Sequence, residues 1–116
     1  MDKELVLKRI SDTGIVAVVR ADNATQAMKI ADACIEGGVP AIELTFTVPG
    51  AHHVIEELAK NYTPDQIILG AGTVMDPETA RIAILAGAQY IVSPYFDEKT
   101  AKLCKDAGVD GVEIHA

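Results

Sequence analysis

Residues 37–49 read Gly-Gly-Val-Pro-Ala-Ile-Glu-Leu-Thr-Phe-Thr-Val-Pro, and this stretch decides the fold. An apolar run that opens on two glycines and closes on a proline is typical of a buried strand that follows the end of a helix. Side chains alternate between the two faces of a strand, so Glu43, Thr45 and Thr47 share one face. The opposite face carries only apolar side chains. One face is therefore predicted to pack into a core, and the other becomes polar toward the end of the strand.

The carboxylate in this strand is a candidate for chemistry. An unpaired buried carboxylate is costly, and such groups cluster at functional sites. Active sites of parallel α/β proteins also gather at the carboxyl ends of the strands. Glu43 is therefore a candidate catalytic residue. The alternative is a structural carboxylate paired with a cation.

Strand-like and helix-like segments alternate along the whole chain. Short apolar runs predict strands at residues 15–20, 37–49, 66–73, 88–94 and 109–116. Segments with apolar residues three and four apart predict a helix before each strand. This alternation predicts a parallel sheet with right-handed crossovers, in one α/β domain covering residues 1–116. We expect β/α repeats of TIM-barrel ancestry, with a flavodoxin-like open sheet as the alternative.

Length and composition limit the possible functions. The 116 residues predict five strands, whereas an eight-stranded (βα)8 barrel needs roughly 200 to 250 residues. The net charge is −7 and the cations are scattered, which argues against nucleic-acid binding. The sequence has no run of about 18 apolar residues for a membrane span, and its first residues do not resemble a signal peptide. We expect no membrane association and a cytoplasmic location.

Four ordered motifs carry a resemblance to a known family. They lie at residues 14–20 (GIVAVVR), 43–49 (ELTFTVP), 70–74 (GAGTV) and 91–94 (IVSP). Together they resemble the 2-keto-3-deoxy-6-phosphogluconate aldolase / 4-hydroxy-2-oxoglutarate aldolase family, from the N-terminus to about Gly108. Members are (βα)8 barrels, usually trimers. They cleave a 2-keto-4-hydroxy acid to pyruvate and an aldehyde through a lysine Schiff base, without metal or other cofactor. The resemblance implies a small keto acid as ligand and a homo-oligomer.

The resemblance also implies roles for individual residues. Glu43 would be the general acid/base, and Thr73 would hold the pyruvate carboxylate, with Pro94 shaping the pocket beside it. Thr47 stands where many members carry an arginine. Arg20, at the end of the neighbouring strand, is expected to supply that cation, because a guanidinium pairs well with a carboxylate or a phosphate.

The chain departs from the family in two respects. The catalytic lysine of the family lies on a sixth strand, whereas every lysine here falls on a predicted helix: Lys3, Lys8, Lys29, Lys60, Lys99, Lys102 and Lys105. Residues 107–116 also depart from the usual pattern of the fifth strand. We therefore expect a partial aldolase barrel that is inactive as this chain.

Two other functions stay open from the sequence. Glu113 and His115 share one face of the last predicted strand, and with Glu43 they could form the metal site of a metal-dependent pyruvate-type lyase. Alternatively, the chain is a non-catalytic or engineered half-barrel whose property is folding and self-association, because five strands leave two unpaired edges.

Overall fold

The computed structural model describes residues 3–113, in which helices and strands alternate as the sequence predicts. None of the helices in this part of the chain is long and apolar enough to cross a bilayer. The helices are α1 (Lys3–Thr13), α2 (Ala24–Glu36), α3 (Ala51–Asn61), α4 (Pro77–Ala86) and α5 (Glu98–Ala107). The strands are β1 (Ala17–Val19), β2 (Ala41–Thr45), β3 (Ile68–Gly72), β4 (Tyr90–Ser93) and β5 (Asp110–Glu113).

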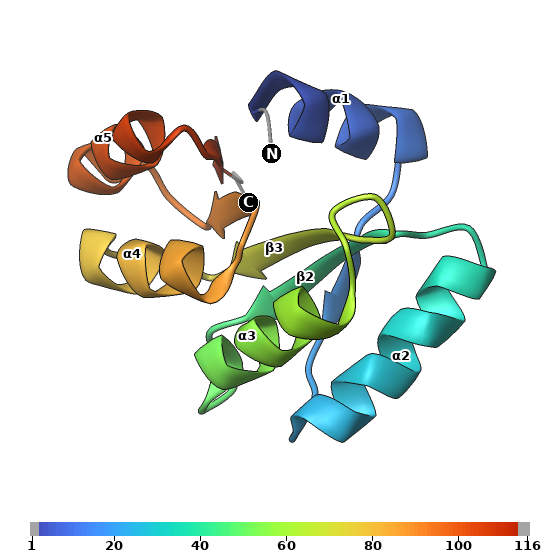
Figure 1. Ribbon diagram of the computed structural model, residues 1–116. Helices are drawn as coiled ribbons and strands as arrows, with labels where there is room; N and C mark the ends of the chain where they lie inside the picture. Colours follow the sequence, from blue (N-terminus) through green and yellow to red (C-terminus); the bar gives the residue numbers. More distant parts are fainter. Residues whose placement is uncertain (1–2, 114–116) are drawn as a thin grey trace.

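The strand order identifies the sheet as the arc of a barrel. The five strands are all parallel and lie in the order β1-β2-β3-β4-β5. Each right-handed crossover therefore steps in the same direction, which places the connecting helices on one side. Figure 1 shows α2, α3, α4 and α5 around the outside of the curved sheet, with α1 across its inner side. A flavodoxin-like sheet reverses direction after its first strands, so that alternative is wrong.

Local signals fix where the helices begin and end. Asn23 and Asp76 cap α2 and α4, each side chain accepting a hydrogen bond from a backbone N–H three residues later. Gly38, Gly87 and Gly108 stand at the joints between a helix and the next strand, with φ of +85°, +122° and +71°. These left-handed conformations favour glycine, which explains why each joint carries one.

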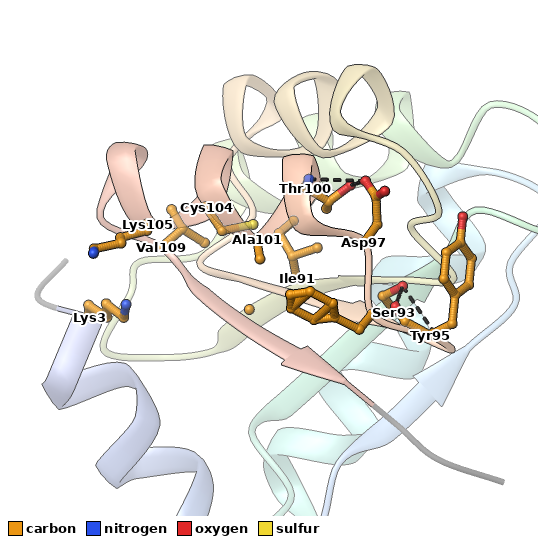
Figure 2. A pocket seen from close by; sticks show the side chains of 12 residues that line it. Lys3, Ile91, Ser93, Tyr95, Asp97, Thr100, Ala101, Cys104, Lys105 and Val109 are labelled. Atoms are coloured by element: carbon orange, nitrogen blue, oxygen red, sulfur yellow. Dashed lines mark hydrogen bonds between the residues drawn. The ribbon is translucent and has the colours of Figure 1, made fainter.

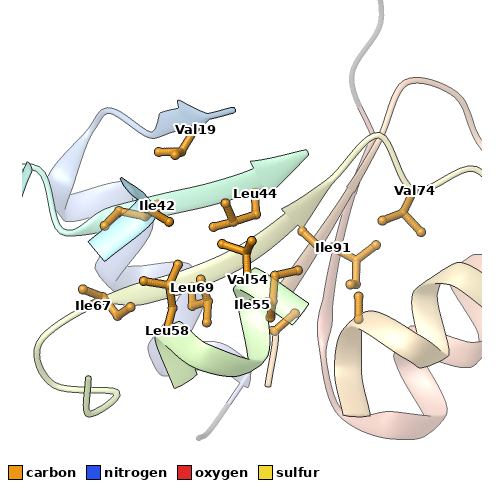
Figure 3. Packing of buried hydrophobic residues seen from close by; sticks show 14 of the residues in the cluster. Val19, Ile42, Leu44, Val54, Ile55, Leu58, Ile67, Leu69, Val74 and Ile91 are labelled. Atoms are coloured by element: carbon orange, nitrogen blue, oxygen red, sulfur yellow. The ribbon is translucent and has the colours of Figure 1, made fainter. Parts of the chain in front are cut away.

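The larger core lies between the outer face of the sheet and the helices (Figure 3). Alternate residues of β2 and β3, such as Ile42, Leu44 and Leu69, point outward and contact Ile55 and Leu58 of α3 within one buried cluster. Burying each of these side chains contributes roughly 1.5–3 kcal/mol. The predicted apolar face of residues 37–49 is thereby confirmed as the face that packs against helices.

A smaller core lies on the inner face, at the amino-terminal ends of the strands. Val6 of α1 packs there against Ala41, Ile68 and Tyr90, the first residues of β2, β3 and β4. The Tyr90 side chain is 1% exposed, and its hydroxyl has no hydrogen-bond partner within residues 3–113. Helix α1 therefore covers the amino-terminal part of the inner face, and the polar residues Glu43 and Thr45 lie further along β2.

The first strand differs from its prediction. Residues 15–20 were expected to form a buried strand, but only Ala17–Val19 pair with β2, and Val18 is 51% exposed. The reason is that β1 is an edge strand whose inner side is not covered by α1. Helix α3 begins at Ala51, after Pro49 and Gly50. Residues 114–116 of the last predicted strand lie outside the described residues.

Replacing Tyr90 by Phe is expected to raise the free energy of unfolding by about 1 kcal/mol, because it removes a buried hydroxyl without a described partner. The matched control is Tyr62→Phe. The Tyr62 hydroxyl donates to the Asp32 carboxylate and lies 3.2 Å from the Met28 carbonyl oxygen, so this change should lower the same quantity. Urea unfolding measures both. A loss in Y90F as large as that in Y62F would contradict the prediction.

Candidate functional site

The strand register places Glu43 in a row of residues that crosses the inner face of the sheet. Glu43 pairs with Val18 on one side and with Gly70 on the other, and the row continues to Tyr90 and Asp110. Paired residues of neighbouring strands point to the same face. Glu43 therefore lies on the inner face, and its side chain is only 8% exposed.

Two glycines of β3 make room for the larger side chains of this row. A Cβ atom on Gly70 would lie 2.1 Å from the Tyr90 ring, and one on Gly72 would lie 2.0 Å from a carboxylate oxygen of Glu43. The Tyr90 ring thus covers Gly70, and the Glu43 carboxylate leans over Gly72 toward the carboxyl end of the sheet. The absence of both Cβ atoms allows these two side chains to lie next to each other.

Burial controls the electrostatics of this pair. Desolvation raises the pKa of the Glu43 carboxyl above its ordinary value. Desolvation, and then the nearby charge of Glu43, also raise the pKa of the Tyr90 phenol. No ion pair of Glu43 is found among the described residues. The structural alternative of a carboxylate paired with a cation therefore receives no support from residues 3–113.

Three threonine hydroxyls form a row beside Glu43, at the carboxyl ends of β2 and β3. The Thr45 hydroxyl oxygen lies 3.1 Å from that of Thr47 and 2.9 Å from that of Thr73. Thr45 is buried, Thr73 is half-buried and Thr47 is exposed. Such a row offers hydrogen-bonding groups to a polar ligand at the point where Glu43 offers a carboxylate.

Thr73 adopts a conformation that is unusual for its residue type. Its φ is +56°, and it is the one residue other than glycine with a positive φ among residues 3–113. A β-branched side chain in this region costs about 1–3 kcal/mol, and such strain clusters at functional sites. The neighbouring backbone is held on both sides, because the Phe46 N–H donates to the Gly72 carbonyl and the Val74 N–H donates to the Val92 carbonyl.

The other two candidate residues lie at the same edge of the sheet. Arg20 directly follows β1 and Pro94 directly follows β4, and both are exposed. No ion pair of Arg20 is found in the described part of the chain. The structure thus connects Thr47 and Thr73 through Thr45, which lies on the same face of β2 as Glu43, and places Arg20 and Pro94 directly after the flanking strands.

The metal-site alternative has no support within the described residues. No cluster of three potential ligands is found among them. His115 lies outside the described residues, so its part in that alternative is not tested. In the strand register, the backbone of Glu43 lies level with that of Asp110. Glu113 lies three positions further along β5.

A separate hollow of about 240 Å³ lies beneath α5, on the helix-covered side of β4 and β5 (Figure 2). Buried Ile91 and Cys104 line its middle, and Lys3 and Lys105 lie together at one end. None of the five candidate residues belongs to its lining. The hollow is therefore distinct from the edge of the sheet where the candidate residues gather.

Sequence reasoning missed two residues that shape the site. Thr45 lies on the predicted polar face, but its central place in the hydroxyl row depends on its contact with Thr73 from the next strand. Tyr90 was read only as part of an apolar strand. The signal that could have found it is the pair of glycines in residues 70–72, because glycines in a strand mark the close approach of other groups.

Alanine substitutions of strand glycines should separate these packing roles. Gly70→Ala is expected to lower the free energy of unfolding by about 3 kcal/mol, because the buried Tyr90 ring cannot move aside. Gly72→Ala meets the end of a flexible side chain, so it should cost about 1 kcal/mol and displace the Glu43 carboxylate. Gly111→Ala, where a Cβ meets nothing closer than 3.7 Å, is the control and should stay within about 0.5 kcal/mol. Equal losses in G70A and G111A would contradict this packing.

The raised pKa of Glu43 predicts a pH dependence of stability. The folded state holds this proton more tightly than the unfolded state, so the stabilisation is complete below the ordinary value of 4.5 and is lost as the pH rises through the raised pKa. Glu43→Gln should therefore gain stability relative to the unsubstituted protein as the pH increases from about 4.5 to 8. Urea unfolding at several pH values measures this gain.

The control for that experiment is Glu56→Gln. Hydrogen bonding to Lys60, and the Lys60 charge, lower the pKa of the Glu56 carboxyl, so its contribution has the opposite sign. The stability of E56Q relative to the unsubstituted protein should stay nearly constant over the same pH range, because this contribution is already present above the ordinary value of 4.5 and is lost only at lower pH. If E43Q followed the same trend as E56Q, Glu43 would not be the desolvated carboxyl described above.

Comparisons with known proteins identify the family of this chain. A family model described as "Aldolase: KDPG and KHG aldolase" matches residues 6–112. The chain is 33% identical to the 2-dehydro-3-deoxy-phosphogluconate aldolase of Haemophilus influenzae and 32% identical to the KHG/KDPG aldolase of Escherichia coli K12. These alignments cover 87% and 82% of this chain but 47% and 44% of the relatives.

A solved structure of an aldolase is also similar to this chain. The 2-keto-3-deoxy-6-phosphogluconate aldolase of Zymomonas mobilis ZM4 matches with a TM-score of 0.76 and 26% identity, over 84% of this chain and 46% of that one. The chain spans about half the length of the curated relatives it matches. On the match over residues 6–112 and these relatives, the chain belongs to the KDPG and KHG aldolase family.

Proposed function

We propose that this chain is a partial class I (Schiff-base) aldolase barrel, one α/β domain over residues 1–116, that binds a 2-keto acid at the carboxyl ends of β2 and β3. The proposed substrates are 2-keto-3-deoxy-6-phosphogluconate and 4-hydroxy-2-oxoglutarate, which the complete enzyme would cleave to pyruvate and an aldehyde. One observation carries the proposal. A buried carboxylate, Glu43, lies beside a row of three threonine hydroxyls at an accessible edge of the sheet.

In this proposal Glu43 is the general acid/base. Cleavage of the bond between C3 and C4 requires removal of the proton on the C4 hydroxyl, and the C3 carbon must later receive a proton. A carboxyl whose pKa is raised by burial can hold and release a proton closer to neutral pH than an exposed one. Its raised pKa therefore suits proton transfer better than it suits pairing with a fixed cation.

The substrate carboxylate would bind at the threonine hydroxyls. Thr73 and Thr47 can donate hydrogen bonds to its oxygens, and Arg20 can add a positive charge from the exposed end of β1. Pro94 would form the wall beyond Thr73. These roles are supported by the common position of all four residues at the carboxyl edge of the sheet.

Schiff-base chemistry also requires an amine, and the lysines of this chain do not suit that role. All seven are exposed and lie on helices α1, α2, α3 and α5. An exposed ammonium keeps its hydration, whereas a nucleophilic lysine needs an environment that favours the neutral amine. We therefore propose that this chain binds the keto acid without forming the covalent intermediate.

The proposal includes self-association and a cytoplasmic location. Ile15 and Val18 are 58% and 51% exposed at the β1 edge of the sheet. Exposed apolar residues on an unpaired edge favour contact with another chain. A second copy is the partner we propose, in keeping with the oligomers expected from the family resemblance.

Titration of the ¹⁵N-labelled chain with pyruvate, followed by NMR, tests the binding site. Pyruvate should shift the signals of Glu43 and Thr73. Thr73→Val should weaken binding about fivefold, which is the effect of one lost hydrogen bond. Thr63→Val is the control, because Thr63 is exposed beyond α3, near the opposite ends of the strands. Equal weakening by T63V and T73V, or shifts confined to other residues, would contradict the proposed site.

Borohydride reduction of the same sample tests the proposal that no lysine of this chain forms a Schiff base with the keto acid. Incubation with pyruvate and borohydride, followed by an intact-mass measurement, should give no covalent adduct. An adduct on one lysine would show that a Schiff base forms on a helix lysine, and would overturn that statement while leaving the binding site intact.

A further inference from the structure

The Tyr90 hydroxyl is a buried polar group that the proposed function does not use. The Tyr90 side chain is 1% exposed, and its hydroxyl oxygen has no hydrogen-bond partner among residues 3–113. A buried hydroxyl without a partner is costly, and buried tyrosines usually find one. A phenylalanine would fill almost the same space without that cost, so the hydroxyl itself needs a physical explanation.

The ring places this hydroxyl over β3, between its own strand and the strand of Glu43. The ring carbon Cζ, which carries the hydroxyl, is the atom nearest to a Cβ placed on Gly70, at 2.1 Å. Gly70 pairs with Glu43 in the register of β2 and β3. Neighbouring strands lie about 4.8 Å apart, so the hydroxyl is about one strand spacing from the Glu43 backbone. The flexible Glu43 side chain can span that distance.

The Glu43 carboxylate lies in a different position in the structure. One of its oxygens is 2.0 Å from the place of a Cβ on Gly72, two residues further along β3 than Gly70. Neither glycine has a Cβ atom that would block the path between them. Rotation of the Glu43 side chain alone therefore moves the carboxylate between the position over Gly72 and a position beside the Tyr90 hydroxyl.

The other charged groups near the inner face do not lie on the path of this hydroxyl. Asp110 of β5 pairs with Tyr90, but the ring tip lies over β3, on the opposite side of β4. Arg20 is exposed beyond the end of β1. On α1, Arg9 donates to backbone carbonyls of the loop after α3. The remaining titratable residues of α1 are exposed: Lys3, Glu4, Lys8 and Asp12.

We infer that Tyr90 is a positioning residue for Glu43, whose ionised carboxylate accepts a hydrogen bond from the Tyr90 hydroxyl and whose protonated form lies over Gly72. A carboxylate is a strong acceptor, and hydrogen bonding to the charged form of an acid favours that form. The nearby charge of Glu43 helps to raise the pKa of the Tyr90 phenol, as expected for close neighbours. The hydroxyl therefore limits the rise in the Glu43 pKa that burial causes.

This inference rests on the proposed general acid/base role of Glu43 and adds the group that controls its ionisation. Such a residue must be partly ionised at the working pH, yet still hold a proton when it acts as the acid. Desolvation alone favours the protonated form. The Tyr90 hydroxyl stabilises the ionised form without a fixed cation, and it stays neutral itself because its own pKa is raised.

The test measures the pKa of Glu43 by NMR, on the purified chain with ¹³C at the glutamate carboxyl carbons. The signal that is absent from E43Q identifies Glu43. Tyr90→Phe should raise this pKa by about one unit, a tenfold change in acid strength, because one hydrogen bond to a charged group is lost. Tyr62→Phe is the control and should leave it unchanged, because Tyr62 packs against the larger core and its hydroxyl donates to Asp32.

Nuclear Overhauser effects separate a hydrogen bond from a general change in the polarity around Glu43. In the unsubstituted protein, contacts between the Glu43 Hγ and Tyr90 Hε protons should strengthen as the pH rises through the Glu43 pKa. Contacts of the same Hγ protons with the Gly72 Hα protons should weaken. Contacts that do not change with pH, or an equal Glu43 pKa in Y90F and the unsubstituted protein, would overturn the inference and leave the proposed function standing.

The stability of Y90F gives a second readout. The gain expected from removing the hydroxyl belongs to the state in which Glu43 is protonated and the hydroxyl has no partner. This gain should be complete below pH 4.5 and disappear as the pH rises through the Glu43 pKa, because the unsubstituted protein then forms the hydrogen bond. A gain that is equal at every pH would also overturn the inference. None of these measurements uses a ligand, so absence of pyruvate binding would overturn the proposed function alone.

Discussion

The two glycines on the inner face of β3 are the constraint on which the site depends. Without Cβ atoms at positions 70 and 72, the neighbouring strands fill the space from opposite directions. Tyr90 of β4 covers Gly70, and Glu43 of β2 leans over Gly72 toward the carboxyl edge. A larger residue at either position would push a side chain of the site out of place. The position of the Glu43 carboxylate is thus set by the absence of a Cβ atom at Gly72 of the adjacent strand.

The same strand keeps the site separate from the main core. Leu69 and Ala71 point outward into the helix-covered cluster, whereas the two glycines face inward. Burial of apolar side chains therefore holds the sheet on one face, and polar contacts are assembled on the other. Chemistry on the inner face can change through single side chains without loss of the outer packing, because the two faces share backbone but not side-chain contacts.

Local sequence patterns predicted the elements of this fold better than their arrangement. The helix caps and the glycine joints at Gly38 and Gly108 act within a few residues, so they can be read from one segment. Strand order is not local, which is why the flavodoxin-like alternative stayed open until the order was seen. The exposure of Val18 was missed for the same reason, since it depends on which elements cover an edge strand.

The residues of the site show the same difference between local features and features that depend on strand arrangement. Glu43, Thr47 and Thr73 could be named from strand ends and from the family resemblance, but the central place of Thr45 in the hydroxyl row depends on a contact between two strands. Because neighbouring strands of a barrel are also neighbours in the sequence, β2 and β3 bring the carboxylate and the hydroxyls together without any distant element. The proposed proton transfer and carboxylate binding therefore use only residues of this arc of the sheet, whereas the proposed Schiff-base chemistry would need an amine that no lysine of this chain places there.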